Sequence, residues 1–394
     1  MLFTYLGQHF SKPHSFTMKH LSNKFLAVTS GVFLISIFSA FITSANNNNK
    51  YPAHTHFIHP GILNTAENLD FIASQLSANN AERKAAYQKI LDFINAHKYP
   101  TSFPSTVYVG SNGHTSPSKT QIRSDAELAY AFALKFAAAG NMDDAQKAIG
   151  ILNGWAYHFH DYQIIDSHKD NAHQPSLETS WTTPIFVAAA EIVRYYKPKG
   201  VSAKWSKKDI QQFENYLNLV KDDYINRIPN YHNNWNVSAG YAKISIGVFL
   251  NSDSVYNDGK KMLYAVFPSV IESDGTMPEL CVRHDCVHYQ YSLTGFTYAA
   301  EIADIQDDSS LYSALDKRIS AGYDFTRKAY NQSTDCNYCS VASPLFPGVE
   351  VAYKHYGTNS MKSLREMQAP LGVPIDNTFL GFTTFTHYGL PSQK

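Results

Sequence analysis

The stretch DAELAYAFALKFAAA, residues 125–139, decides the fold class of this sequence. Its apolar residues recur at helical spacing, and Gly140 follows as a stop signal. Because the stretch is rich in alanine and apolar on more than one face, we expect a helix that neighbouring helices cover on both sides. Inner helices of this kind are typical of layered, all-helical folds.

Helical patterns of the same kind continue from about residue 56 nearly to the end of the chain, whereas strand-like alternation is scarce. Roughly ten helices, several of them joined by long polar loops, predict an all-α domain in which inner and outer helices alternate. Antiparallel helix pairs of this kind close naturally into an α/α toroid. An open solenoid is the alternative, but no period of about 30–45 residues is visible. The expected helices cover residues 66–76, 81–96, 125–139, 142–157, 181–196, 208–226, 235–250, 254–272, 291–305 and 311–330.

Two long polar loops are candidates for function, because long loops in a compact domain usually carry binding or catalytic residues. The first covers residues 162–180 and contains His168, His173 and Gln174. The second covers residues 331–349. A short run at 105–109 is predicted to be a strand edge or part of a loop.

The composition excludes several classes of protein. The 33 Lys+Arg balance 33 Asp+Glu, so no basic excess indicates a nucleic-acid partner. Hydrophobic residues make up 44% of the chain, which excludes a disordered protein. Aromatic residues reach 14%, a share that either a large core or a sugar-binding surface would explain.

The N-terminal region has the layout of a signal peptide. Basic residues after Met18 precede a largely apolar stretch at 25–42, and small residues end at Ala45. We therefore expect a signal peptide within residues 1–45, with its start at Met18 and cleavage near Ala45. A spacer at 46–56 and a single toroid domain at 57–394 follow. The alternative is an uncleaved membrane anchor. Cleavage would give an exported protein, periplasmic or secreted, with no membrane contact.

Four cysteines lie in the C-terminal half, as a C-x4-C pair and a C-x-x-C pair. In an oxidising compartment they favour one or two disulfides. A zinc site is the alternative, although zinc ribbons usually show two C-x-x-C knuckles. The spacing does not fix which cysteines pair. The four residues are Cys281, Cys286, Cys336 and Cys339.

An asparagine-rich segment, Asn230 to Asn236, precedes an apolar helix pattern. It reads NYHNNWN, with four Asn, one His and one Trp. One Asn is enough to cap a helix, so four in seven residues indicate more than capping. Side-chain amides and an imidazole beside an aromatic ring are suited to holding sugar hydroxyls and carboxylates.

A second polar segment follows the turn at Asp274-Gly275. It places an Arg, two His and two Tyr within nine residues, just before another apolar helix. Whether helical or partly extended, such a segment brings Arg and Tyr side chains toward one ligand. A solvent-exposed polar helix start is the alternative interpretation. The residues are Arg283, His284, His288, Tyr289 and Tyr291.

These segments together resemble the alginate lyase superfamily, polysaccharide lyases with an incomplete α/α toroid. Each motif is weak alone, but their order and spacing are fairly specific. The Asn-rich segment is similar to the family's Asn-Asn-His-Ser-Tyr-Trp, and the second polar segment to its Asp-Gly-x-x-Pro-x-Glu-Leu region. The matching stretches are His59–Ile62, Ser124–Tyr130 with Ala148–Trp155, Ser176–Trp181 with Ala190–Tyr195, Asn230–Trp235 and Asp274–Leu280.

The resemblance implies roles for individual residues. His232 falls on the family's catalytic His, Arg283 on its carboxylate-binding Arg and Tyr289 on its catalytic Tyr. It also implies a sugar cleft without metal or other cofactor, and an anionic polysaccharide as partner of a monomeric protein. The residues expected to bind the substrate are Asn233, Asn234, Trp235, Trp181, His288 and Tyr291.

Two departures from the family pattern place the chain in a divergent branch. The Asn before the family His is Tyr231 here, so amide neutralisation would come from Asn233 or Asn234. The Arg-to-Tyr spacing is one residue shorter than in the alginate-specific branch. This shift leaves His288 or Tyr291 as alternative occupants of the Tyr position, and it leaves the identity of the uronic-acid polymer open.

The implied reaction is β-elimination. A uronic-acid lyase removes the proton at C5, next to the carboxylate, and expels the oxygen at C4. Arg283 and an amide would neutralise the carboxylate, His232 would be the base and Tyr289 the acid. In a syn elimination Tyr289 would serve as both, with His232 neutralising.

Two other functions remain open at this stage. A glycoside hydrolase on the same toroid needs two carboxylates that flank the scissile bond, and Asp274, Glu279 or Asp285 would supply them. A non-catalytic, exported polysaccharide-binding protein needs only the cleft.

Overall fold

The computed structural model describes residues 56–111, 113–165, 171–372 and 378–391. The predicted signal peptide at 1–45 and the spacer up to residue 55 lie outside these residues, as does His168. The described residues belong to one structural unit that begins at Lys50. None of the helices in this described part is long and apolar enough to cross a membrane.

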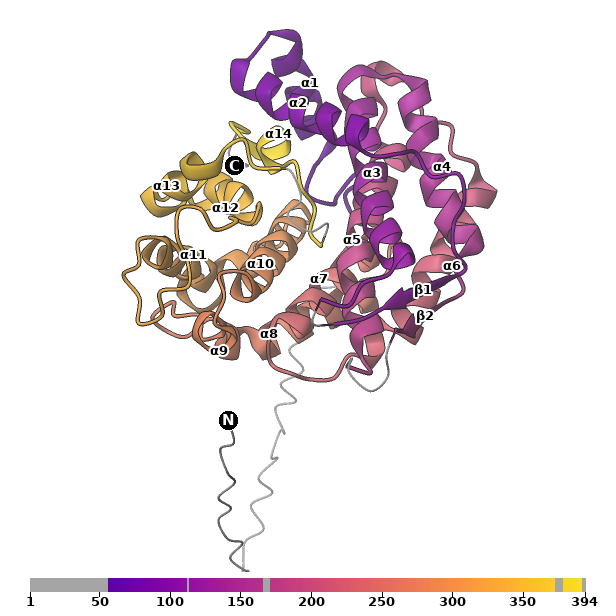
Figure 1. Cartoon of the computed structure of the whole chain (residues 1–394). Coiled ribbons are helices and arrows are strands. Elements are labelled where there is room, and N and C mark those ends of the chain that lie inside the picture. The colour runs from indigo at the N-terminus through magenta and orange to yellow at the C-terminus, as the bar shows by residue number, and fades with distance from the viewer. Residues whose placement is uncertain (1–55, 112, 166–170, 373–377, 392–394) are drawn as a thin grey trace, which may run out of the picture. The chain divides into compact units, whose positions relative to one another are not determined.

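Four long helices form an inner layer and are buried on nearly every side. In sequence order each packs against the next, as Figure 1 shows. Their many Ala, Gly, Ser and Thr side chains are small, which lets other helices approach them on both faces. The predicted inner helix at 125–139 is the buried part of the first of them. They are α3 (Pro117–Ala139), α5 (Gln174–Tyr195), α7 (Asn234–Phe249) and α10 (His288–Ile305), and α12 (Gly348–Tyr356) continues the layer.

A second set of helices covers the inner layer from outside and buries one face only. In the outer helix at Lys207–Asp223, for example, the buried residues are Phe213, Tyr216, Leu217 and Val220, which follow the spacing of an amphipathic helix. The alternation of inner and outer helices is the α/α toroid that the sequence predicted. The outer helices are α4 (Met142–His158), α6 (Lys207–Asp223), α8 (Asp253–Val270), α11 (Ser310–Tyr330) and α13 (Asn359–Gln368).

The first and last helices of the described chain pack together. Helices α1 (Ala66–Ser77) and α2 (Ala81–Ala96) contact both α3 and α14 (Thr383–His387), so the yellow C-terminal segment lies beside the indigo N-terminal pair in Figure 1. Three short elements complete the helical part: η1 (Pro198–Gly200), η2 (Ile225–Arg227) and α9 (Glu279–Arg283).

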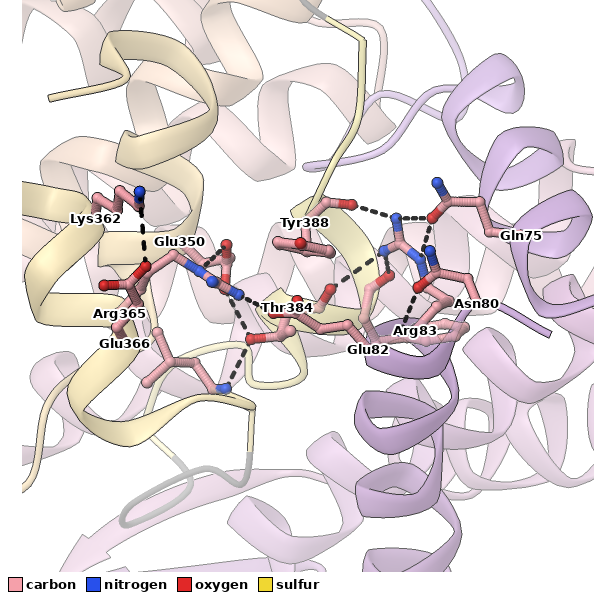
Figure 2. A network of polar contacts seen from close by, with 12 residues as sticks. Gln75, Asn80, Glu82, Arg83, Glu350, Lys362, Arg365, Glu366, Thr384 and Tyr388 are labelled. Atoms are coloured by element: carbon pink, nitrogen blue, oxygen red, sulfur yellow. Dashed lines mark hydrogen bonds and ion pairs between the residues drawn. The ribbon is translucent and has the colours of Figure 1, made fainter. Parts of the chain in front are cut away.

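Two buried guanidinium groups hold these chain ends together (Figure 2). Arg83 on α2 donates to Gln75 Oε1 at 2.9 Å and 2.7 Å, and also to backbone carbonyls of α14 and Tyr388. Arg365 on α13 pairs with Glu350 at 2.9 Å and with Glu82 of α2. Burial lowers the pKa of Arg83 to about 10, so the group stays charged at neutral pH.

The only strands of the described chain form one small parallel pair. Strand β1 (Thr106–Val109) pairs with β2 (Asp161–Ile164), so the short run predicted as an edge or loop is a strand. Both strands contact α5, and β1 also contacts α3. The pair fixes the loop that begins at Gly110 against the start of α3.

Candidate active site

A cavity of about 800 Å³ lies where four inner helices begin. Residues from the first turns of α3, α5, α7 and α10 line it, together with the loop after β1 and the end of α9. The N-terminal end of a helix carries unpaired N–H groups and a partial positive charge, so this arrangement favours an anionic ligand. The lining residues are Gly110, Ser111, Gly113, Lys119, Arg123, Asn171, Gln174, Leu177, Trp181, Tyr231, Asn233, Asn234, Trp235, Arg283, His288 and Tyr291.

The asparagine-rich segment supplies one side of this cavity, and its amides have separate tasks. Asn233 caps α7, because its Oδ1 accepts the N–H of Trp235 at 3.0 Å. Asn236 holds the preceding turn: its Oδ1 accepts the N–H groups of Tyr231 and His232, both at 2.8 Å. Asn234 makes neither of these contacts, and it lines the cavity. Of these three Asn residues, Asn233 is the helix cap.

Asn234 is anchored from behind by Glu279 of α9. Its Nδ2 donates to Glu279 Oε1 at 2.6 Å, which leaves its second amide hydrogen for a ligand. Burial raises the pKa of Glu279 to about 7, against the opposing effects of the Asn234 hydrogen bond and the Arg283 charge. Glu279 therefore positions an amide and does not itself line the cavity.

His232 lies outside the cavity. Its side chain is exposed, its backbone φ is 54°, and its carbonyl oxygen accepts a hydrogen bond from Ser269 Oγ at 3.1 Å. The base role predicted for His232 is therefore not supported by its position.

Arg283 and His288 also line the cavity, and Asp285 lies behind His288. Arg283 Nη2 lies 2.9 Å from His288 Nε2, and His288 Nδ1 lies 2.6 Å from Asp285 Oδ2. Asp285 Oδ1 accepts the backbone N–H groups of Val287 and His288, both at 2.9 Å, and so sets the start of α10. Burial would raise the pKa of Asp285, but these N–H groups and His288 hold it below its usual range.

Two disulfides attach this segment to the loop that follows α11. Cys281 pairs with Cys336 and Cys286 with Cys339, so one crosslink lies on each side of Arg283. The prediction of disulfides is confirmed, and the structure supplies the pairing that the spacing left open.

Tyr289 and Tyr291 point to different sides of α10. Two residues differ by about 200° around a helix, so the two rings cannot share a face. Tyr289 is fully buried, and its hydroxyl lies 3.6 Å from Cys339 Sγ. Burial raises its pKa well above the usual range. Tyr289 does not line the cavity, so its predicted acid role has no geometric support. Tyr291 does line it, together with His288 one helical turn earlier.

An aromatic pair and basic groups complete the cavity. The rings of Trp181 and Tyr291 stack with centroids 5.2 Å apart, and Trp181 Nε1 donates to Ser238 Oγ at 3.1 Å. The guanidinium of Arg123 lies 5.0 Å from the Trp181 ring and pairs with Glu178 at 2.5 Å. Lys119 and Arg123 were not predicted as site residues, although their i, i+4 spacing before an apolar helix pattern was a usable signal.

A hydrolase would need two carboxylates in the cavity, and the nominated residues are not placed there. Asp274 is exposed in a turn, where its Oδ1 accepts the N–H of Thr276 at 2.9 Å. Glu279 lies behind Asn234, and Asp285 behind His288. Among the described residues that line the cavity, none is Asp or Glu. No group of three or more His, Cys, Asp or Glu that would hold a metal occurs in the part of the chain described.

A second cavity, of about 860 Å³, lies at the opposite end of α10. Asp304, Asp307, Lys354 and His355 are among its lining residues. None of the site residues predicted from the sequence lines it. The candidate active site is therefore the cavity at the helix starts.

Solved structures of similar fold support the α/α toroid architecture. Alginate lyase A1-III from Sphingomonas species A1 matches with a TM-score of 0.62 and 18% identity, over 82% of this chain and 95% of that one. A variant of A1-III in complex with a tetrasaccharide matches with a TM-score of 0.60 and 17% identity, over 84% of this chain and 100% of that one. No curated protein is significantly similar in sequence.

The sequence itself carries a family signature over more than half of its length. The model of the alginate lyase family matches residues 71–334, a range that contains every lining residue of the cavity. The likeness predicted from short motifs is thereby confirmed on independent grounds, and the chain belongs to the alginate lyase family of polysaccharide lyases.

Proposed function

We propose that the protein cleaves a uronic-acid-containing polysaccharide by β-elimination in the cavity at the starts of α3, α5, α7 and α10. The observation that carries the proposal is the convergence of Arg283, the Asn234 amide and four helix N-terminal ends on one cavity. All of these groups favour a carboxylate ligand.

Carboxylate binding is the step that makes the elimination feasible. The proton at C5 is very weakly acidic while the neighbouring carboxylate is anionic, because removing it adds charge to an already negative group. Arg283 supplies a permanent charge and a planar pair of donors, and Asn234 supplies an amide hydrogen held in place by Glu279. Each preorganised donor of this kind contributes about 10²–10³-fold to the rate.

The acid and base are proposed from the residues that reach the cavity. His288 and Tyr291 lie one turn apart on α10, with ring centroids 5.7 Å apart. They take over the roles that the family pattern suggested for His232 and Tyr289. Proton transfer by positioned groups contributes about 10²–10⁴-fold. Tyr291 also stacks on Trp181, and both rings line the cavity in which the sugar would bind.

The neutral net charge of the chain does not oppose an anionic substrate. Lys119, Arg123 and Arg283 all line the cavity, while the acidic residues of its surroundings lie behind the lining. The charged side chains among the described lining residues are therefore all basic, and that of Arg123 is paired with Glu178.

We also propose that the protein is exported, to the periplasm or beyond the cell. The signal-peptide layout of residues 1–45 and the two disulfides support this location. N-terminal sequencing of the protein from a periplasmic or culture fraction tests it. A new N-terminus near Ala45 is expected, and an intact Met18 N-terminus in a membrane fraction would contradict it.

The test of the proposed reaction is absorbance in the band of unsaturated uronates. The purified mature chain is mixed in turn with polymannuronate, polyguluronate, glucuronan and glycosaminoglycans. A rise with at least one polymer is expected. New reducing ends without this absorbance would instead indicate a hydrolase. Binding without either signal would indicate a non-catalytic polysaccharide-binding protein.

A further inference from the structure

Asp285, His288 and Arg283 form a continuous chain of hydrogen bonds that ends in the cavity. Asp285 Oδ2 lies 2.6 Å from His288 Nδ1, and His288 Nε2 lies 2.9 Å from Arg283 Nη2. The side chains of Asp285 and His288 are 34% and 31% exposed, so both are held at the edge of the cavity, not in the core. Arg283 and His288 line the cavity, whereas Asp285 does not.

The two partners fix the protonation state of the imidazole. A guanidinium only donates hydrogen bonds, so His288 Nε2 must accept the bond from Arg283. Nδ1 then carries the single ring proton and donates it to Asp285. The ring of His288 is therefore neutral, with its lone pair on the nitrogen that faces the cavity.

We propose that Asp285 is a positioning residue that holds His288 as the base of the reaction, and that Arg283 blocks this base until a uronate carboxylate binds. The inference rests on the proposed lyase function and deepens it. In the free protein the lone pair of Nε2 is engaged by Arg283. A substrate carboxylate competes for the same guanidinium, because charged, bidentate hydrogen bonds to a carboxylate are stronger than one bond to a neutral ring.

The geometry connects recognition to proton transfer. The carboxylate of a uronate is attached to C5, the carbon whose proton is removed. When Arg283 turns to the carboxylate, Nε2 is released next to that proton. A neutral sugar has no group that would draw Arg283 away, so the base stays blocked. Selection for uronates is thus built into the release of the base as well as into binding.

The lone pair of His288 Nε2 takes the C5 proton, and the electrons of the C5–H bond form the C4=C5 double bond. The C4–O bond breaks with its electron pair on O4, which takes a proton from the hydroxyl of Tyr291. The imidazolium of His288, stabilised by Asp285, returns its proton through solvent to the Tyr291 phenolate. No oxidant, reductant or further reactant is required.

The charged and titratable groups around His288 determine its pH dependence. Asp285 faces Nδ1, Arg283 faces Nε2, and Tyr291 contacts the ring edge. Glu279 acts on both Arg283 and Asp285, and Lys119 and Arg123 also line the cavity. Asp285 is the one carboxylate bonded directly to the ring in the described part of the chain.

The test is Asp285→Asn. The new amide oxygen still accepts the backbone N–H groups of Val287 and His288, so the start of α10 is kept. The new NH2 group faces Nδ1, which must then accept, and the ring proton moves to Nε2. We expect kcat to fall by about 10²–10⁴-fold with KM changed less than about threefold. The acid limb of the kcat/KM profile should move to lower pH, because the carboxylate no longer stabilises the imidazolium.

Three further measurements separate positioning from a structural role. Asp285→Glu keeps the carboxylate and should regain at least about tenfold of the lost kcat. His284→Gln is the matched control, because His284 stacks on Tyr338 outside the cavity. The activity of this variant should equal that of the native protein. Histidine-selective ¹⁵N NMR reports the tautomer directly, with His288→Gln identifying the signal. The native protein should show the Nδ1–H form and Asp285→Asn the Nε2–H form.

The outcomes distinguish this inference from the proposed function. If the native protein forms no unsaturated product from any polyuronate, the lyase function fails, and the inference falls with it. If the native protein is an active lyase but Asp285→Asn keeps more than about a tenth of its kcat, the lyase function stands and the inference is overturned. An Nε2–H tautomer in the native protein would overturn it as well.

Discussion

The indole of Trp181 on α5 and the phenol of Tyr291 on α10 stack with their centroids 5.2 Å apart and their planes 29° apart. The two residues come from helices that are separated in the inner layer by α7, and both line the cavity. Trp181 is also only 8% exposed and is fixed by the hydrogen bond of its Nε1 to Ser238. The pair forms a rigid aromatic surface in the wall of the cavity, and we propose that a sugar ring lies against it.

Replacing Trp181 tests this surface. Trp181→Ala removes the ring and should raise KM for the active polymer about tenfold, since aromatic contacts are worth about 0.5–1.5 kcal/mol each. It should also lower the free energy of unfolding by about 3–5 kcal/mol, because a buried indole is deleted. Trp181→Phe keeps an aromatic plane and should show a smaller rise in KM. Initial rates over a range of polymer concentrations and urea unfolding supply both numbers. Equal KM values for all three proteins would contradict a sugar-binding role.

Arg283 should be the most sensitive position for activity. Arg283→Ala removes both the charge and the donors for the carboxylate, so kcat/KM should fall about 10²–10³-fold. Arg283→Lys keeps the charge but not the planar pair of donors, and should lie in between. Arg227→Ala is the control, because Arg227 pairs with Asp223 on the exposed surface. Since Arg283 is exposed, its variants should melt as the native protein does. A native kcat/KM in Arg283→Ala would exclude this residue from carboxylate binding.

The two disulfides should differ in accessibility. Cys286 and Cys339 are 5% and 1% exposed, whereas Cys281 and Cys336 are only partly buried. A mild reductant followed by an alkylating reagent should therefore label Cys281 and Cys336 first, as peptide mass spectrometry would show. The double variant Cys286→Ser/Cys339→Ser should lose about 2–5 kcal/mol of stability. It should also lose activity, because the segment with Arg283 and His288 is then held by one crosslink. First labelling of Cys286 would contradict this order.

Protonation of the buried His387 should lower the free energy of unfolding in acid. Burial lowers its pKa to about 4, while the charge of Glu301 opposes the shift. The folded protein therefore binds this proton less readily than the unfolded chain, whose pKa is about 6.5. Its contribution to stability is complete above pH 6.5 and is lost as the pH falls toward 4. Between pH 6.5 and 4.5 the loss should be about 2 kcal/mol.

The matched variant is His387→Gln, which has no titrating ring at this buried position. Urea unfolding at pH 7 and pH 4.5 is compared for both proteins. The native protein should lose more stability between these pH values than the variant does. An identical loss in both would show that other groups cause the acid sensitivity.

The apolar pattern predicted the buried parts of the helices well and their first turns poorly. Helix α2 was predicted with its observed bounds, 81–96. Helix α3, however, begins at Pro117 and not at 125, and α5 begins at Gln174 and not at 181. The extra turns are polar because they line the cavity, so they lack the apolar spacing on which the prediction depended. The apolar pattern therefore does not extend to the first turns of these helices, which line the cavity.

The choice between neighbouring site residues depended on helix phase. Asp285 sets the first turn of α10 through two backbone N–H groups, and this start directs Tyr291 and not Tyr289 into the cavity. Because residues 289 and 291 differ by about 200° around the helix, the phase of α10 decides which of the two rings faces the cavity. Sequence spacing identified the segment and its Arg283, but it did not fix where the helix starts.

The contacts of Arg83 and Arg365 have a consequence for synthesis. Arg83 is partnered by carbonyls 301 to 305 residues later in the chain, and Arg365 by Glu82, 283 residues earlier. In a growing chain, Arg83 has its nearby partner Gln75 but not these carbonyls until the segment Thr384–Tyr388 has left the ribosome. A chain that stops before Thr384 lacks the carbonyls of Thr384, Phe385 and Tyr388, which accept hydrogen bonds from Arg83. Chains truncated before Thr384 should therefore have a lower free energy of unfolding, and be degraded faster, than chains that contain α14.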